Sequence, residues 1–126
     1  MVLFLHTDLV NPAKGKFLLV ASISRDNTEV GLVIINTNKS PFAPMNPAVD
    51  ERQWVLPADD RRIVMYDSFA DCSQLKTRPY SEVVQWLNTE KVYRGRLNGR
   101  ELYRVKELLA TAPTIATIVK KRLGLL

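Results

Sequence analysis

The chain has 126 residues, 46% hydrophobic and 25% charged, which is long enough to bury one core and typical of a globular domain, so we predict a single domain over residues 1–126. One cysteine and one histidine exclude a disulfide within the chain and make a structural or catalytic metal improbable, and no apolar stretch approaches the ~20 residues of a membrane span. The net charge of +5 is unevenly placed, because residues 1–60 carry a net −2 and residues 61–126 a net +7. We therefore expect a cytoplasmic protein without metal, cofactor or membrane contact, whose basic half favours nucleic acid or an acidic protein segment. The alternative interpretation of the basic half is a helical surface whose charges are simply solvated.

The first elements predicted are strands. Residues 1–5 form one, and the apolar, β-branched runs at 16–23 and 29–36 form a hairpin around the polar loop 24–28. Both runs are nearly continuous rather than alternating. They should therefore lie in the middle of a sheet or barrel with both faces covered.

A long loop follows from Thr37 to Pro57, where prolines exclude a sustained helix or central strand. Loops of this length are usually functional, so it is a candidate lid or substrate-contacting flap. The alternative is that its large side chains anchor it to the core: Phe42, Met45 and Trp54.

Two more short strands are predicted at 53–56 and 62–66, around the turn at 57–60. Four or five short strands with tight loops favour a small barrel or half-open sheet. The fold class predicted is α+β, with residues 1–75 mainly β and 76–126 mainly helical.

The second half begins with a helix whose apolar positions are Tyr80, Val83, Val84 and Leu87, ending at Thr89-Glu90. A short strand or extended segment follows at 91–97. Asn98 and Glu101 have the spacing of a capping box that starts the next helix.

The stripe of that helix is formed by Leu102, Val105, Leu108 and Leu109, and Ala112-Pro113 ends it. Thr114 is predicted to cap a last helix that turns inward the residues Ile115, Ile118, Val119 and Leu123. Lys120, Lys121 and Arg122 fall in its final turn, where cations oppose the helix dipole.

Polar residues gather where strands are predicted to end. Asn36 and Thr37 follow the second core strand, and a second group follows the predicted fourth strand: Asp67, Ser68, Asp71, Cys72 and Ser73. Closure of the sheet would bring both groups to one rim with His6 or Lys16. The alternative is that these side chains only make turn and capping hydrogen bonds.

A ribonuclease without metal needs a base for the 2′-OH, an acid for the leaving oxygen and donors around the phosphorane. Asp67 or Asp71 are candidate bases, and Lys16 or His6 a candidate acid or phosphate clamp. The candidate donors are Asn36, Thr37 and Ser68, and the pair Arg94 and Arg96 could contact phosphate. The alternative for His6 is a structural role beside its strand. Cys72 is predicted to be a packed thiol.

Three stretches resemble the PemK/MazF-like toxins of bacterial toxin–antitoxin systems. Residues 14–22 are similar to that family's basic residue leading into a core strand, 34–38 to its strand ending in a Thr-containing turn, and 67–75 to its late polar turn. The resemblance implies an SH3-like barrel or half-barrel of the type shared with the CcdB group, followed here by C-terminal helices.

The resemblance also implies a homodimeric endoribonuclease that cleaves single-stranded RNA without metal and is neutralised by an acidic antitoxin. By position, Lys16 takes the role of the family's phosphate-stabilising arginine, Thr37 that of a donor, and Ser73 that of a polar turn residue, with Lys14 beside the substrate. Lysine keeps the charge but lacks the bidentate fork, and the turn acid is displaced to Asp71 or Asp67.

Two other functions fit the same residues. One is a noncatalytic barrel module that binds or inhibits another macromolecule, as in the CcdB group. The other is a nucleic-acid-binding protein that does not cleave and uses the +7 half as an electrostatic surface.

Overall fold

The computed structural model describes residues 1–89 and 91–126, so Glu90, the expected helix end, lies outside the described residues. Its strands are β1 (Val2–Thr7), β2 (Lys14–Ile23), β3 (Glu29–Asn36), β4 (Gln53–Leu56), β5 (Ser68–Asp71), β6 (Lys76–Pro79) and β7 (Tyr93–Gly95). Its helices are α1 (Pro47–Asp50), α2 (Tyr80–Leu87), α3 (Gly99–Ala110) and α4 (Thr117–Arg122), with a 3₁₀ turn η1 (Ala43–Met45). The prediction of an α+β fold with C-terminal helices is confirmed.

The strands form one antiparallel sheet in the order β4-β5-β3-β2-β1-β7, and β6 also pairs with β3. The predicted hairpin is β2 and β3, and it lies at the centre of the sheet. Its nearly continuous apolar sequence follows from that position, because side chains on both faces of a central strand are covered.

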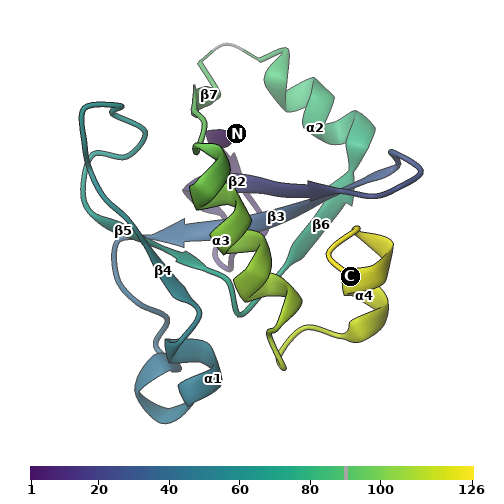
Figure 1. Ribbon diagram of the computed structural model, residues 1–126. Coiled ribbons are helices and arrows are strands. Elements are labelled where there is room, and N and C mark those ends of the chain that lie inside the picture. Colours follow the sequence, from purple (N-terminus) through teal and green to yellow (C-terminus); the bar gives the residue numbers. More distant parts are fainter. Residues whose placement is uncertain (90) are drawn as a thin grey trace.

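The two faces of the sheet carry separate groups of buried side chains. Leu19, Val33 and Ile35 pack on one face with Leu109 of α3, which crosses in front of β2 and β3 (Figure 1). The opposite face carries Leu3, Val30 and Leu32, which pack against Val83 of α2. We call these the α3 face and the α2 face.

The prediction of a strand at 62–66 is wrong. Arg62 has a φ of 55°, a left-handed conformation that interrupts an extended chain, and Ile63 and Val64 are apolar because they pack in the core of the α3 face. The strand begins later, at Ser68. Asp67 therefore precedes it, and Ser68 and Asp71 lie within it rather than after it.

β5 and β6 lie one after the other along the same edge of β3. β5 pairs with Ile35 and Asn36, and β6 pairs with residues 29–32. Residues 72–75 are thus a break between two strands on one edge. β6 lies at the start of residues 76–126, which the sequence predicts to be mainly helical. This break carries polar side chains at the middle of the sheet.

Residues 37–57 are more ordered than a long loop. They contain η1, the single-turn helix α1 and β4, which is the strand predicted at 53–56. No sustained helix forms in residues 37–57, in agreement with the prolines there. Pro47 occupies the first turn of α1, where its missing N–H needs no acceptor, and Asn46 caps that turn. Of the three expected anchors, Trp54 packs against the core, whereas Phe42 and Met45 are exposed.

The predicted capping box at the start of α3 is confirmed: Glu101 N donates to Asn98 Oδ1, and Asn98 N donates to the Glu101 carboxylate. Thr114 does not cap the last helix. Its hydroxyl donates instead to the carbonyl of Ser73, and α4 begins after Ala116. The expectation that Ile118 turns inward is also wrong, since it is 72% exposed.

Arg61 joins the loop between β4 and β5 to the start of α3, because it contacts both Asp59 and Glu101. Its hydrogen bond lowers the pKa of Glu101 from the ordinary value of 4.5. A carboxyl with a lowered folded pKa stabilises the fold above its unfolded pKa, and this stabilisation is lost as the pH falls through the folded value. The pair therefore stabilises the protein at neutral pH and not in acid.

We expect Glu101→Gln to lower the free energy of unfolding at pH 7 by roughly 0.5 kcal/mol, the usual size for a partly exposed pair. Glutamine still completes the capping box, so the substitution removes mainly the charge. Urea unfolding of both proteins over a series of pH values from 7 downward checks this. A difference that does not shrink as the pH falls would contradict the role of the ionised pair.

Candidate nucleic-acid interface

A cleft opens on the α2 face, at the end of the central strands that α2 does not cover. It consists of two adjoining hollows of about 450 and 280 Å³ that share Lys14, Lys16, Asn36, Ser40 and Pro41. The larger hollow also reaches Asp71 and Lys76, and the smaller one reaches Thr37 and Lys39. We call the two hollows together the lysine cleft.

The register of the sheet explains why these side chains meet. Lys14 pairs with Thr7 and Lys16 with Leu5, so both lysines project from the same face of β2. Lys16 Nζ donates a hydrogen bond to Asn36 Oδ1 on β3. The predicted association of Lys16 with Asn36 is thus a cross-strand pair on one face of the hairpin.

Lys16 is half-buried, whereas Lys14 is exposed. Burial, and secondarily the positive charge of Lys14, lower the pKa of Lys16 from its ordinary value. A lowered pKa makes an ammonium group a better proton donor, and it also increases the benefit of an anion that neutralises the charge. Lys16 is therefore suited to hold phosphate and to give up a proton.

Asp71 is the buried acceptor at the inner edge of the cleft, with 4% of its surface exposed. Its Oδ1 accepts from Gln53 Nε2 at 2.8 Å, and from the amide and hydroxyl of Ser73 at 3.2 and 2.5 Å. Its Oδ2 accepts from the exposed Gln74 Nε2 at 2.9 Å. One carboxylate oxygen is thus anchored, while the other faces a side chain that can move away.

Of two further residues predicted for the site, Thr37 lines the cleft and Ser73 lies beside it, behind Asp71. Thr37 is exposed and lines the smaller hollow. Ser73 is buried; its hydroxyl donates to Asp71 and its carbonyl accepts from Thr114, so it positions the carboxylate. The alternative of turn hydrogen bonds therefore describes Ser73 well.

Five predicted site residues lie outside the cleft. His6 pairs with Gly15, so it projects from the face opposite Lys14 and Lys16. Asp67 accepts from the amide of Ala58, and Ser68 is buried and donates to the carbonyl of Tyr66. Arg94 lies over the Phe4 ring and Arg96 follows β7 at the opposite edge of the sheet.

Sequence reasoning missed Lys76, Lys39 and Gln74. Lys76 belongs to β6, which has only four residues and no apolar alternation that would reveal a strand. Lys39 and Gln74 follow strand ends, and their positions depend on how residues 37–57 fold back over the sheet. Their only signal was proximity to the predicted polar turns.

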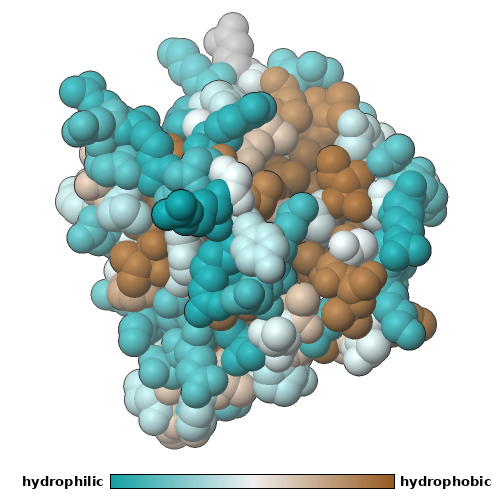
Figure 2. All heavy atoms as spheres, viewed as in Figure 1, coloured by the Kyte–Doolittle hydropathy of each residue, from teal (hydrophilic) through white to brown (hydrophobic). Residues whose placement is uncertain are grey.

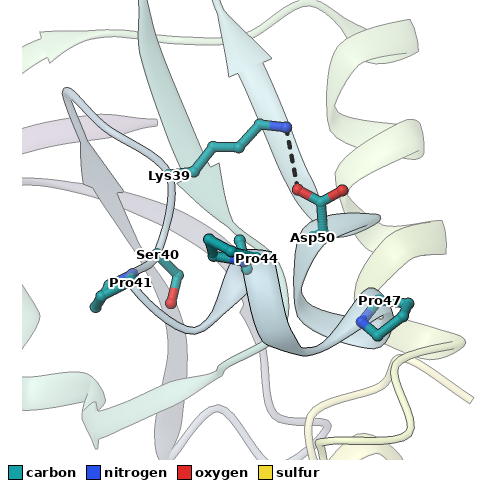
Figure 3. A pocket seen from close by; sticks show the side chains of 7 residues that line it. Lys39, Ser40, Pro41, Pro44, Pro47 and Asp50 are labelled. Carbon is teal, nitrogen blue, oxygen red and sulfur yellow. Dashed lines mark hydrogen bonds and ion pairs between the residues drawn. The ribbon is translucent and has the colours of Figure 1, made fainter.

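Residues 39–50 form a hydrogen-bonded turn beside the cleft. Lys39 reaches across a hollow of about 440 Å³ to Asp50, at 3.1 Å (Figure 3). Ser40 N donates to Gln53 Oε1 at 3.1 Å, and Gln53 in turn donates to Asp71. The turn and the carboxylate are therefore held by the same glutamine.

The helices form a second, different surface. Figure 2 shows hydrophobic residues gathered to the right of α3, from α2 down to α4, whereas the upper left, where the loop between β4 and β5 lies, is mainly hydrophilic. Ile23, Ile118 and Leu126 are 45%, 72% and 53% exposed. Lys106 of α3 and Lys121 of α4 are exposed as well, so this surface is both apolar and basic.

Cys72 lies in the core of the α3 face, and burial raises the pKa of its thiol to about 12. The thiolate is the nucleophilic form of cysteine, so this side chain is unreactive. Its position agrees with the packed thiol that the sequence suggested.

Within residues 1–89 and 91–126, no group of three His, Cys, Asp or Glu side chains is placed to hold a metal ion. The helices in the same residues are all too short or too polar to cross a bilayer. Comparison with models of protein families, with curated proteins and with solved structures found no match.

Proposed function

We propose that the protein binds single-stranded RNA in the lysine cleft and cleaves it without metal, as the toxin of a toxin–antitoxin system. The observation that carries the proposal is the meeting of Lys14, Lys16 and Lys76 in one hollow with the amide of Asn36. Ammonium groups attract a phosphate backbone, and neighbouring amide and hydroxyl groups hydrogen-bond its sugars and phosphates.

The chemistry would use the two ends of the cleft. Asp71 Oδ2 would take the proton of the 2′-OH once Gln74 moves aside, and the 2′ oxygen would attack the phosphorus. Lys16 would hold the phosphorane oxygens and give its proton to the leaving 5′ oxygen, which leaves a 2′,3′-cyclic phosphate on the other fragment. Loss of the proton from Asp71 to solvent and uptake of one by Lys16 would then restore both groups. Removing one such transition-state contact usually costs about 10²- to 10³-fold in rate.

Binding of a fluorescent RNA oligomer tests the proposal. Three phosphate contacts predict a slope of log affinity against log salt of about −2, or roughly 20-fold weaker binding from about 50 to about 200 mM salt. Lys14→Ala with Lys16→Ala should reduce the slope by about 1.4, because each contact to a single strand contributes about 0.7. Fluorescence anisotropy measures both.

The matched control is Lys106→Ala with Lys121→Ala, which removes the same charge from exposed positions on the helices. We expect this pair to change RNA affinity much less. Equal losses from both pairs would assign binding to the general charge of the basic half and would overturn the cleft as the interface.

A second candidate function is RNA binding without cleavage. The observation that favours it is the near-complete burial of Asp71, together with the placement of His6 on the other face. RNA that stays intact with wild-type protein, while the lysine-dependent binding persists, would select this function.

We also propose that the protein has a protein partner and acts in the cytoplasm. The apolar and basic surface beside α4 supports binding of an acidic antitoxin segment, or pairing of two copies as a homodimer, in the cytoplasm. The strongly paired β1, β2 and β3 support a relation of this sheet to the SH3-like barrel of the PemK/MazF and CcdB groups. Growth arrest on expression in bacteria, relieved by Lys16→Ala, tests the toxin role.

A further inference from the structure

Phe42 is an exposed aromatic side chain at a place where exposure needs an explanation. It has 62% of its surface exposed, although it lies in a turn that packs against the sheet. The residue next to it, Ala43, is buried. The chain thus turns a small residue inward and presents a large ring to solvent.

Hydrogen bonds hold the backbone that carries Phe42 in its turn. Its carbonyl accepts from the amides of Met45 and Asn46 at 3.2 and 3.0 Å. Ser40, two residues earlier, is tied to Gln53, and Lys39 pairs with Asp50 across the turn (Figure 3). The ring is therefore presented by a preorganised segment, which lowers the entropic cost of using it in binding.

Phe42 stands between two hollows. It lines the larger hollow of the lysine cleft, and it also lines a neighbouring hollow of about 370 Å³ on the side of Met45 and Val49. Ser40 and Gln74 line both as well. A chain lying along the lysines would thus pass Phe42 on its way from one hollow to the other.

We propose that Phe42 is the stacking platform for a base of the strand that the lysine cleft binds, an inference that rests on the proposed function. Single-stranded nucleic acids are held by cations along the backbone and by aromatic side chains on which bases stack. Lys14, Lys16 and Lys76 supply the first component, and Phe42 supplies the second. The ligand is accordingly a polymer with both phosphates and bases, not an inorganic anion.

The test compares two probes: a fluorescent single-stranded oligoadenylate and inorganic polyphosphate of similar charge, which has no bases. Phe42→Ala should weaken binding of the oligoadenylate by roughly 5- to 150-fold, the range found for loss of one base stack. It should leave polyphosphate binding unchanged. Phe42→Trp should restore oligoadenylate binding, whereas Phe42→Leu, which is apolar without a ring, should not.

Tyr66→Ala is the matched control, because Tyr66 has a ring that is 68% exposed and lines neither hollow, so we expect oligoadenylate binding to be unchanged. Circular dichroism verifies that each variant is folded. Oligoadenylate binding that depends on Lys16 but is unchanged in Phe42→Ala would overturn the stacking role and leave the cleft proposal intact. Absence of any oligoadenylate binding by the wild-type protein would overturn both.

Discussion

Replacing Asp71 by alanine is expected to lower the free energy of unfolding by about 3 kcal/mol, the upper range for buried donors left without an acceptor. The side-chain amide of Gln53 and the hydroxyl of Ser73 would lose their common partner inside the protein. The loss would reach the turn at residues 39–50, since Gln53 also holds Ser40. Urea unfolding followed by circular dichroism measures it.

Asp71→Asn separates the structural role of this residue from its proposed chemistry. Asparagine keeps one oxygen for Gln53 and Ser73, and Gln74 can turn its amide to accept from the new NH₂ group. We expect a stability loss of about 1 kcal/mol and, well below the unfolding temperature, no RNA cleavage. Cleavage at the wild-type rate would remove Asp71 from the chemistry.

Asp67→Ala is the control for both variants. Asp67 is exposed and accepts one described hydrogen bond, from the amide of Ala58 at 2.8 Å. We expect its removal to cost less than about 1 kcal/mol and to leave RNA binding unchanged. A cost as large as that of Asp71→Ala would contradict the central position assigned to Asp71.

Leu109→Ala is expected to destabilise the protein by about 2–5 kcal/mol, because it leaves a cavity where α3 packs on the sheet. Leu109 is fully buried in the core of the α3 face, among side chains of β2 and β3. Thermal and urea unfolding would both show the loss. RNA affinity, measured where the variant is still folded, should be unchanged, since the cleft lies on the other face.

Ile118→Ala supplies the comparison, because the sequence predicts that both Leu109 and Ile118 turn inward from their helices. Ile118 is 72% exposed, so we expect its truncation to change the unfolding free energy by no more than about 0.5 kcal/mol. A loss comparable to that of Leu109→Ala would mean that this surface is covered in solution, as by a second copy of the chain.

Sequence patterns predicted the elements that are stabilised by residues close along the chain. The hairpin of β2 and β3 follows from two long β-branched runs, and the start of α3 from Asn98 and Glu101, whose side chains satisfy amides within one helical turn. The association of Lys16 with Asn36 was also within reach, since both lie on strands that the hairpin pairs. These features depend on neighbours close along the chain.

The sequence mispredicted elements whose structure depends on contacts with distant parts of the chain. Ile63 and Val64 are apolar like a strand, but they belong to a loop that packs in the core. The four-residue β6 has no alternation of apolar residues, and it forms because the edge of β3 is free to pair with it. Ile118 has helical spacing, yet the direction of α4 is set by Ile115 and Leu123, which are buried beside it. Sequence periodicity does not say which side of a short helix meets the sheet.

The sequence by itself determined the α+β class, the central hairpin, the capped helix and the candidates Lys16, Asn36, Thr37 and Asp71. Only the tertiary structure decided that His6 faces away from them, that Asp67 lies outside the cleft and that Lys76 and Phe42 join it. The physical reason is the alternation of strands: moving one position along β1 or β2 places a side chain on the other face. Which face carries the cleft depends in turn on where α2 and α3 pack.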